Sequence, residues 1–464
     1  MPHPASRPPS TRRKQYPQVK GVFPHITAIA KGVGSRTEAG IGALIPWADK
    51  LWAVGYVSHI EGRGLGLYEI GQDMSMRRHP ASVTGTFANR LPHWPSDQAF
   101  IGPHAIDADG NVRTINALKK QRLAATAAHL TDPEGRVYFL TMEGRLYEVN
   151  VRTLKATLLS DLTKELGIPA GAQAHFKDAF CAADRLVVTH NAYEEQEFLG
   201  ERQAGRLGCW DGDRWTVVER NPFVGAGGGG GPRYGGPSIY ATGWCRSSAI
   251  LRHYNRGRWS RYLLPKASQC FDHTWNTEWM RIRHAQTERY LMDLHGMFYE
   301  LPPFAYSGRV WGLRPICAHL RLVPDFCYWR GLFVMAGDQI DHDEGQPQSG
   351  LWFGNIDELW QMGKPSGWGG PWWEDPVQAG QTSDPFLMTG FDKKVLHMSQ
   401  RSGREATFLV EVDFLGNGSW KQYDAFKVPD GGYVHHEFPD AFSAQWVRVT
   451  IDKNCTATAC FTYG

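Results

Sequence analysis

The sequence lacks the long Ala-, Leu-, Glu- and Lys-rich runs that build helical proteins. It is instead rich in residues of turns and strands, with 51 Gly, 28 Pro, 18 Trp and 17 Tyr among 464 residues. Aromatic residues favour strands, and frequent Gly and Pro mark the turns between them. The composition therefore predicts an all-β fold. The length alone does not fix the number of domains, because large β architectures often exceed the usual domain size.

An excess of charge of one sign and a long apolar run are also absent. The chain carries 50 basic and 47 acidic residues, a net charge of +3, which gives no electrostatic case for a nucleic-acid or membrane-surface partner. No apolar run reaches the length that spans a bilayer. The first 20 residues, MPHPASRPPSTRRKQYPQVK, lack the apolar core of a secretory signal. As written, the sequence predicts a cytoplasmic monomer, or a secreted one if its true start has been lost.

Paired cysteines are missing as well. The eight cysteines are scattered without a CxxC pair, which argues against a zinc ribbon or a redox motif. We expect most of them to be small buried hydrophobic residues. A disulfide between Cys455 and Cys460 in a hairpin is a sterically allowed alternative. The full set is Cys181, Cys209, Cys245, Cys270, Cys317, Cys327, Cys455 and Cys460.

A short phrase recurs along the chain, as GLGLYEI at 64–70, GRLYEV at 144–149 and GMFYEL at 296–301. Each follows a run of strand-forming residues, so the repeated unit reads strand, glycine turn, strand. Repeated hairpins of this kind are typical of a β-propeller, and roughly 60 residues per blade gives about seven blades.

We therefore predict a seven-bladed β-propeller over residues 37–464, preceded at 1–36 by a short, disordered, Pro-rich and basic tail and a lead-in. The sequence leaves open whether this start belongs to the ring. The closing strand is expected in QWVRVTI (445–451) or TACFTYG (458–464). The run GAGGGGGPRYGGP at 225–237 is interpreted as a flexible connection, because the contexts of a phosphate-binding loop are missing.

The stretch DHTWNTEW at 272–279 has a composition that suits neither a core strand nor a surface helix. An indole can cover the apolar face of a sugar ring while an amide and a carboxylate bond its hydroxyls, so Trp275, Asn276 and Glu278 are candidate sugar ligands. A Trp-rich core strand is the alternative. The acidic run from Asp338 to Glu344 would suit a structural Ca²⁺, but its spacing is not that of an EF-hand, and a solvated acidic loop is the favoured interpretation.

Several long phrases resemble one family of enzymes: NRLPHWPSDQAFIGPHAID, LPKASQCFDHTWNTEW, ERYLMDLHGMFYELP, RPICAHLRLVPDFCYW and GGYVHHEFPDAFSAQWVRVTIDK. They are similar to the seven-bladed propeller enzymes that remove L-rhamnose from D-glucuronate, namely the L-rhamnose-α-1,4-D-glucuronate lyases and the related rhamnosyl-glucuronidases that act on gum arabic and arabinogalactan proteins. The ulvan lyases are more distantly similar. The resemblance runs from about residue 37 to the end of the chain.

The resemblance implies β-elimination at a uronate whose O4 carries the rhamnose. This chemistry needs a cation to neutralise the carboxylate, a base to remove the C5 proton and an acid to protonate O4. His104 is the first candidate for base or acid, with His93 and His175 as further candidates. His59 matches a histidine that serves a hydrolase site in some relatives. The candidates for binding the substrate are Arg283, Arg314, Arg321, Lys177 and Arg185, together with Trp275, Asn276 and Glu278.

One segment departs from the pattern that the resemblance implies. Where the relatives are expected to read HxKxxYxxQGR, this chain reads HFKDAFCAADR, with Phe180 and Ala183 at the Tyr and Gln positions. A phenyl ring has no titratable proton, so Phe180 cannot serve as acid or base. Three hypotheses are left open: a lyase that releases rhamnose, a hydrolase of the same linkage and a sugar-binding propeller without activity.

Overall fold

The computed structural model describes residues 21–22, 39–57, 66–191, 204–229, 237–267, 279–286, 289–302, 309–319, 321–337 and 350–464. Within these ranges nearly every regular element is a β-strand, so the all-β prediction is confirmed. The helical elements in these ranges are short: α1 (Leu162–Glu165), η1 (Trp94–Ser96) and η4 (Ile356–Gln361). In this described part, no helix is long and apolar enough to cross a membrane.

Among the described residues between 21 and 354, seven antiparallel units of four strands follow one another. Six of them pair their strands in chain order, and the seventh adds the first strand of the chain to its outer edge. The units are β2 (Ala39–Trp47), β3 (Lys50–Val57), β4 (Leu67–Ile70) and β5 (Met76–Arg78); β6 (Arg90–His93), β7 (Gln98–Ile101), β8 (His104–Asp107) and β9 (Val112–Thr114); β10 (Leu123–Ala128), β11 (Arg136–Thr141), β12 (Arg145–Asn150) and β13 (Ala156–Asp161); β14 (Phe176–Ala182), β15 (Arg185–His190), β16 (Arg206–Trp210) and β17 (Trp215–Glu219); β18 (Phe223–Gly229), β19 (Ser238–Trp244), β20 (Ala249–Asn255) and β21 (Arg258–Leu264); β22 (Arg281–Gln286), β23 (Arg289–Leu294), β24 (Met297–Glu300) and β25 (Arg314–Ala318); and β26 (Phe326–Trp329), β27 (Leu332–Gly337) and β28 (Gly350–Gly354) with β1 (Gly21–Val22).

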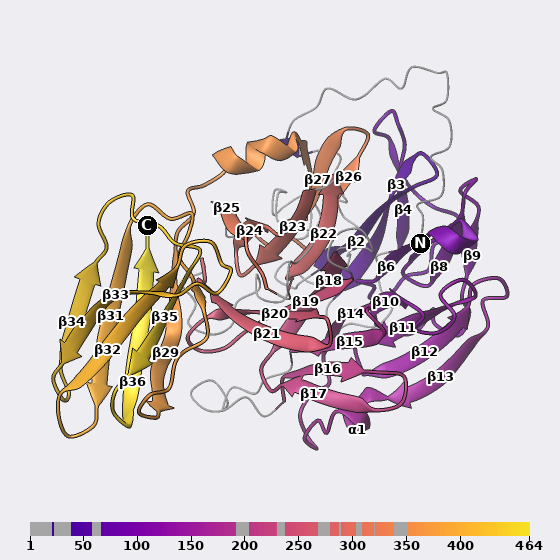
Figure 1. Ribbon diagram of the computed structural model, residues 1–464. Coiled ribbons are helices and arrows are strands. Elements are labelled where there is room, and N and C mark those ends of the chain that lie inside the picture. The colour runs from indigo at the N-terminus through magenta and orange to yellow at the C-terminus, as the bar shows by residue number, and fades with distance from the viewer. Residues whose placement is uncertain are drawn as a thin grey trace.

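These units are arranged as the blades of a propeller (Figure 1). The first strand of each blade contacts the first strand of the next, in the order β2, β6, β10, β14, β18, β22 and β26, and β26 contacts β2 again. The contacts therefore form a closed cycle around one axis. Closure leaves each blade covered by a neighbour on both faces, which explains why central strands such as β3 are buried almost throughout.

The repeated phrase in the sequence corresponds to tight turns within the blades. Gly144 joins β11 to β12 and Gly296 joins β23 to β24, with φ values of +86° and +84°. Glycine adopts this left-handed conformation at no steric cost, which explains why these two copies of the phrase begin with it. The hairpins predicted at 144–149 and 296–301 are therefore present.

The glycine-rich run that was interpreted as a flexible connection begins as a strand instead. β18 lies between β14 and β22, and its glycines allow both neighbours to approach closely. A Cβ atom at Gly227 would lie 2.8 Å from Cβ of Ile282, and one at Gly228 would lie 2.1 Å from Cε1 of Phe180. A side chain at either position would force the first strands of three blades apart.

The ring is closed by a strand from the start of the chain, and both strands predicted for this role lie elsewhere. β1 pairs with β28, placing Gly21 opposite Phe353 and Val22 opposite Trp352. The outermost strand of the last blade thus comes from within residues 1–36, the range predicted to hold a tail and a lead-in. The predicted closing segments form β35 (Trp446–Ile451) and part of β36 (Cys455–Tyr463), which belong to other sheets.

Residues 367–463 form two further sheets, so the prediction of one propeller over 37–464 does not hold for this range. One sheet has the order β29-β36-β31-β34 and the other β30-β35-β32-β33. Apolar side chains that meet between them include Leu396, Phe408 and Phe461, all fully buried. The remaining strands are β29 (Gly367–Val377), β30 (Phe386–Leu387), β31 (Lys394–Arg401), β32 (Ala406–Asp413), β33 (Lys421–Val428) and β34 (Tyr433–Glu437).

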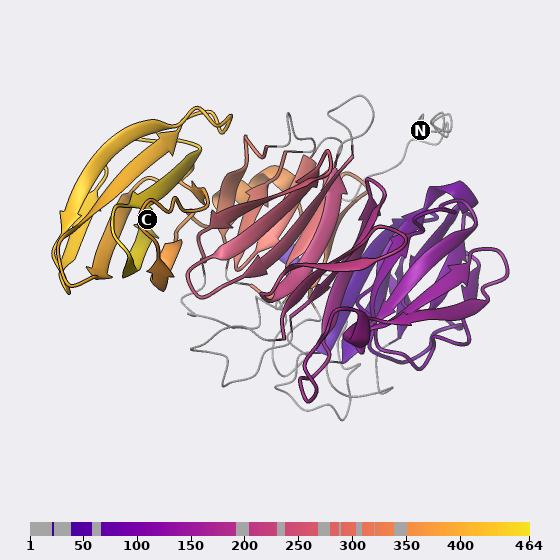
Figure 2. The same cartoon turned by 60° about the horizontal axis from the view of Figure 1, so that its bottom comes forward.

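This C-terminal sandwich lies beside the ring and is joined to the fifth blade (Figure 2). Leu263 of β21 pairs with Phe386 of β30, so one sheet runs from the ring into the sandwich. The Trp446 ring lies 4.7 Å from that of Tyr262, and its Nε1 donates to the carbonyl of Val310 at 3.1 Å. Backbone pairing and a shared apolar core therefore hold the two parts together.

The disulfide alternative for Cys455 and Cys460 is wrong. Both thiols are free and both residues lie on β36. Five residues along a strand span about 17 Å, which is far beyond the reach of a disulfide.

The short strand β1 should make a measurable contribution to stability. Pairing of so short an edge contributes on the order of 1–2 kcal/mol, which corresponds to about 2–8 °C in thermal midpoint. We expect deletion of residues 1–22 to lower the midpoint, measured by calorimetry, by this amount. Deletion of residues 1–18 keeps β1 and serves as the control; equal midpoints for the two truncated proteins would show that β1 does not secure the ring.

Candidate functional site

All seven first strands begin on the same side of the ring. Each of the first six blades winds from its inner strand to its outer strand in chain order, and each strand is antiparallel to the one before. The fourth strand of a blade therefore ends on the side of the ring where its first strand began, and the next blade starts on that same side. We call this side the first-strand face. Side chains at or just before the starts of the first strands gather there.

Asp325, directly before β26, ties several blades together near the axis. Its Oδ2 accepts a hydrogen bond from the backbone N–H of Leu44 at 2.8 Å and lies 2.8 Å from Nε of Arg90. Its Oδ1 accepts from Nε of Arg283 at 3.0 Å. Burial alone would raise the pKa of Asp325, but the charges of Arg90 and Arg283 hold it below its usual range. This carboxylate is therefore ionised and structural.

Asp178 on β14 is a second buried acid near the axis. Its Oδ1 accepts from the backbone N–H of Ala179 at 2.9 Å, and its Oδ2 accepts from that of Ala226 at 3.1 Å. Burial raises the pKa of Asp178, and the charges of Arg283 and Arg281 oppose the shift. The acid thus fastens β14 to the glycine-rich β18.

Arg281, the first residue of β22, has a different environment. Its side chain is fully buried, yet its hydrogen bond in the described part of the chain goes to the carbonyl of Met280 at 3.0 Å, and its Nε has no acceptor there. No carboxylate among the described residues lies within 4 Å of it; burial lowers its pKa, and the charge of Asp178 opposes the shift. A buried guanidinium without a carboxylate partner is costly, and this makes Arg281 a candidate for binding an anion.

Trp279 brings this arginine together with a lysine from another blade. The guanidinium of Arg281 lies 5.0 Å from the centre of the indole, and Nζ of Lys177 on β14 also lies 5.0 Å from it. The indole is buried and meets the ring of Tyr56 edge-on at 4.7 Å. It shares an apolar cluster with Leu322, which precedes β26. Two cations from the fourth and sixth blades thus lie against one aromatic ring at the first-strand face.

His175 immediately precedes β14 and is half-buried. Its backbone N–H donates to Nε2 of His190 at 3.0 Å, while Nδ1 of His190 lies 2.9 Å from the carbonyl of Ala204. The His190 proton must therefore sit on Nδ1, and this histidine is a neutral structural group. His190 thereby positions the backbone of His175 at the first-strand face, two residues before Lys177.

The other two predicted catalytic histidines in the described residues lie away from this group. His104 is on the third strand of its blade, about 10 Å from the first strand, and is fully buried with Nδ1 bonded to Oγ1 of Thr114 at 3.1 Å. His93 ends β6 and therefore lies toward the opposite face. Both of its ring nitrogens are engaged, by Ser96 at 2.7 Å and by the carbonyl of Pro133 at 2.8 Å.

The segment HFKDAFCAADR does not form one site. His175 and Lys177 lie at the start of β14, whereas Ala183 is in the turn that follows the strand and Arg185 begins β15. The length of β14 separates the two ends by about 20 Å. Arg185 contacts the ring of Tyr254 at 5.8 Å, far from Lys177. Phe180 lies part of the way along β14, against Gly228.

The three predicted arginines have three different environments. Arg283 is near the axis but already pairs with Asp325. Arg314 is exposed on β25, an outer strand. Arg321 is half-buried next to Leu322, and its backbone N–H donates to Nδ1 of His319. Of the predicted substrate ligands, the structure brings Lys177 and Arg283 near the axis and leaves Arg314 and Arg185 at the periphery.

Several predictions lie outside the described residues. These are His59, the sugar ligands Trp275, Asn276 and Glu278, and the acidic run at 338–344. In the ranges that the structure does describe, no group of three or more His, Cys, Asp or Glu side chains is placed to hold a metal ion.

Sequence reasoning missed Arg281 and Trp279 as site residues. The sequence did hold a signal, because Arg281 and Arg283 are two residues apart in a strand and so point to the same side. That signal identifies neither which arginine has a carboxylate partner nor which contacts the indole.

Comparisons with known proteins assign no family to the chain, and three solved structures align with it at TM-scores below 0.5. No family model matches the chain, and no curated protein matches it. Among solved structures, the RRP9 WD40 repeats align with a TM-score of 0.42 and 8% identity over 72% of this chain and 98% of that one. The β-propeller domain of Cps50 (Swd1) from Myceliophteria thermophila aligns with a TM-score of 0.39 and 10% identity over 68% and 98%. A chain of a nidogen/laminin complex gives 0.33 and 11% over 55% and 94%. The fold assignment rests on the strand pairing of this chain itself.

The buried histidines predict how stability depends on pH. Burial lowers the pKa to about 4 for His104 and about 3 for His190 and His253. Because these values lie below 6.5, the unfolded chain takes up protons first as the pH falls. The contribution of these neutral histidines to the free energy of unfolding is complete above pH 6.5. It is lost as the pH falls toward 3–4, at about 1.4 kcal/mol for each unit by which the pKa is lowered.

His253 and His190 form a matched pair for this test. The His253 ring stacks on Tyr240 at 4.6 Å, and neither ring nitrogen has a hydrogen-bond partner in the described structure. We expect His253→Phe to keep full stability at pH 7 and to lose less of it at pH 5. His190→Phe removes two hydrogen bonds and should cost about 1–3 kcal/mol at pH 7. Urea unfolding at both pH values checks this, and an unchanged pH dependence in His253→Phe would contradict a neutral buried imidazole.

Proposed function

We propose that this protein is a carbohydrate-active lyase that removes terminal L-rhamnose from D-glucuronate by β-elimination, in glycans of the gum arabic and arabinogalactan type. The proposal takes its reaction from the sequence resemblance and its location from the first-strand face. The observation that carries the location is the buried guanidinium of Arg281, which has no carboxylate partner among the described residues.

Arg281 and Lys177 supply what the carboxylate of the substrate needs. Both cations lie 5.0 Å from the centre of the same indole, so at most about 10 Å separates the two charges. Low exposure strengthens their attraction for an anion, because the surroundings of Arg281 contain little water to screen it. A uronate carboxylate placed there would satisfy a charge that the described protein leaves without an acid.

The reaction itself requires a proton transfer at each end of the breaking bond. A base takes the proton from C5, the electron pair of that bond forms the C4–C5 double bond, and the C4–O4 bond breaks. The departing oxygen of rhamnose receives a proton from an acid. His175 is the best-placed candidate for one of these roles, since it is half-buried beside Lys177, whereas His104 is enclosed on a third strand.

Two alternatives remain tied to particular residues. Phe180 stands where a titratable Tyr is expected, which favours a sugar-binding propeller without activity. A hydrolase of the same linkage would use His59, which lies outside the described residues. The lyase is preferred because a buried cation without a carboxylate partner among the described residues suits an anionic transition state more than it suits binding of a neutral ring.

Product analysis tests the proposal directly. The purified protein is incubated with gum arabic and with ulvan oligosaccharides while ultraviolet absorbance and free rhamnose are followed. We expect rhamnose and the absorbance of an unsaturated uronate to rise together. Rhamnose without absorbance would show hydrolysis instead. If the folded protein gave neither rhamnose nor absorbance, the hypothesis of a sugar-binding propeller without activity would be favoured.

Substitution of Arg281 separates function from stability. Arg281→Met keeps most of the side-chain volume and removes a buried charge that has no described carboxylate partner, so the free energy of unfolding should stay the same or rise. Loss of the cation should lower kcat/KM for rhamnose release by about 10²–10³-fold. Both are measured on the same preparation, by urea unfolding and by the rhamnose assay.

Arg283→Met is the matched control. Arg283 lies on the same strand but pairs with Asp325 at 3.0 Å, so its loss should destabilise the fold by about 3–5 kcal/mol. Full activity in Arg281→Met would place the site elsewhere. Equal destabilisation by the two substitutions would show that Arg281 is structural.

A further inference from the structure

The C-terminal sandwich presents a polar and aromatic surface on one of its sheets. In the sheet β29-β36-β31-β34, alternation turns Leu396, Met398 and Gln400 of β31 inward, where they are buried. The intervening His397, Ser399 and Arg401 face outward. Ser399 has a neighbour on each side of its strand. The half-buried Thr458 of β36 lies opposite it on one side, and the exposed Tyr433 of β34 lies opposite it on the other.

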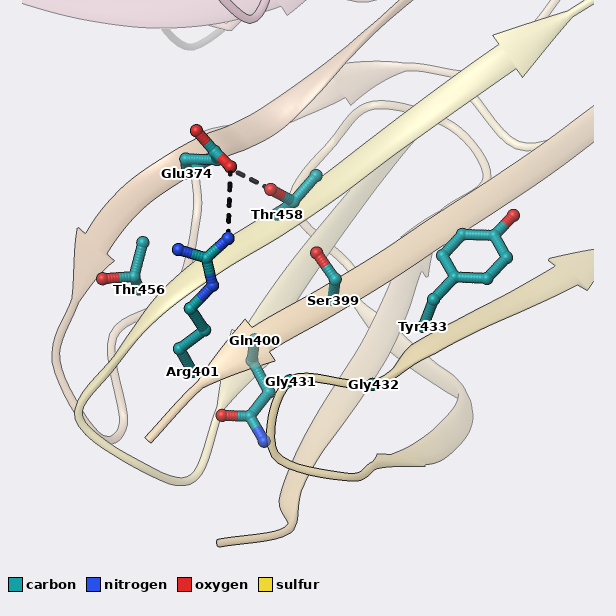
Figure 3. A pocket seen from close by; sticks show the side chains of 9 residues that line it. All are labelled: Glu374, Ser399, Gln400, Arg401, Gly431, Gly432, Tyr433, Thr456 and Thr458. Carbon is teal, nitrogen blue, oxygen red and sulfur yellow. Dashed lines mark hydrogen bonds and ion pairs between the residues drawn. The ribbon is translucent and has the colours of Figure 1, made fainter. Parts of the chain in front are cut away.

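A cavity of about 250 Å³ opens on this outer surface (Figure 3). Its lining includes Tyr433, Ser399, Thr458, Arg401 and Glu374, which come from all four strands of the sheet. In the view of Figure 3 the hydroxyls of Ser399 and Thr458 lie between the Tyr433 ring and the pair formed by Glu374 and Arg401. The volume lies just below the usual range for small-molecule sites, which suits one sugar ring.

The Tyr433 ring is held in a fixed orientation although its residue is 61% exposed. Its hydroxyl is bonded to Nδ1 of His397 at 2.7 Å. The rings of His397 and His435 lie nearly parallel to it, at angles of 17° and 22° and centroid distances of 6.0 and 5.9 Å. A large aromatic residue is exposed and yet oriented, so little conformational entropy is lost when a ligand stacks on it.

The other end of the cavity carries one acid and one base. Glu374 follows a break in the register of β29, has a φ of +52°, and its backbone N–H donates to Oγ1 of Thr458 at 3.0 Å. Its carboxylate lies 3.8 Å from the guanidinium of Arg401, and the two side chains are 61% and 78% exposed. Such a long, exposed ion pair is weak and leaves both groups able to bond a ligand.

We propose that this cavity is a second carbohydrate site, which binds a neutral pyranose residue by stacking on Tyr433 and by hydrogen bonds from its hydroxyls to Ser399, Thr458, Glu374 and Arg401. The negative charge of Glu374 and the positive charge of Arg401 cancel, so the cavity offers no net positive charge to a uronate. Hydroxyl, carboxylate and guanidinium groups beside one aromatic ring match the alternating polar and apolar faces of a sugar. The site lies in the sandwich and is independent of the reaction proposed for the ring.

The first test uses the full-length protein in native gels that contain gum arabic. We expect the polysaccharide to retard the wild-type protein. Tyr433→Ala should weaken the apparent affinity about two- to tenfold, the effect of losing one stacking contact. Because Tyr433 is exposed, this truncation should leave the thermal midpoint unchanged. Arg401→Ala, which removes a donor at the other end of the cavity, should weaken retardation as well.

Phe414→Ala is the matched control, because Phe414 is an aromatic residue of the same sandwich, 52% exposed and outside the cavity. It should bind as the wild type does. Arg281→Met controls for the ring: it should lower kcat/KM for rhamnose release by about 10²–10³-fold and leave retardation intact. Retardation that survives Tyr433→Ala, or that is lost in Arg281→Met, would overturn the proposal.

A second measurement defines the ligand class. Methyl α-L-rhamnopyranoside, methyl β-D-galactopyranoside and methyl β-D-glucuronide are added as competitors of gum arabic in the same gels. Competition by one of the neutral glycosides and not by the glucuronide is the expected result. Competition by the glucuronide alone would contradict a neutral site even if Tyr433 were involved.

Discussion

The carboxylate of Asp325 is the interaction on which the ring depends most directly. It precedes the first strand of the seventh blade and bonds a backbone amide of the first blade, Leu44. It also pairs with Arg90 of the second blade and Arg283 of the sixth. One buried acid thus joins four blades where their first strands meet. A propeller must hold its inner strands against one another without backbone pairing between blades, and here buried charge supplements apolar packing in that role.

The sequence predicted the fold class because the signal is local. The two copies of the repeated phrase at 144–149 and 296–301 each begin with a left-handed glycine, Gly144 or Gly296, that stands between two strand-forming runs. The sandwich at 367–463 was missed because its hairpins carry the same local pattern, while its identity lies in the order β29-β36-β31-β34, which no local pattern records. The closing strand was missed because Gly21 and Val22 pair with residues more than 300 positions away.

The site was predictable only in the types of residue involved. Lys177, Arg283 and His175 were selected because cations and histidines suit the implied chemistry. Whether an arginine is free to bind an anion depends on its partners, and two arginines on one strand differ completely: Arg283 has the carboxylate of Asp325, and Arg281 has an indole and a carbonyl. His104 resembled a catalytic group in sequence, but burial on a third strand keeps it neutral.

The attachment of the sandwich bears on what two carbohydrate sites could do together. Pairing of Leu263 with Phe386 continues a blade directly into the sandwich, and Trp446 packs on Tyr262 at the same junction. The proposed sites are therefore held at a fixed separation, not joined by a flexible linker. A branched glycan that reaches both would bind the second site intramolecularly, which raises the effective concentration of its termini at the ring. A rigid junction gives this advantage only to glycans whose branches match that separation, so its geometry would act as a selector of substrate.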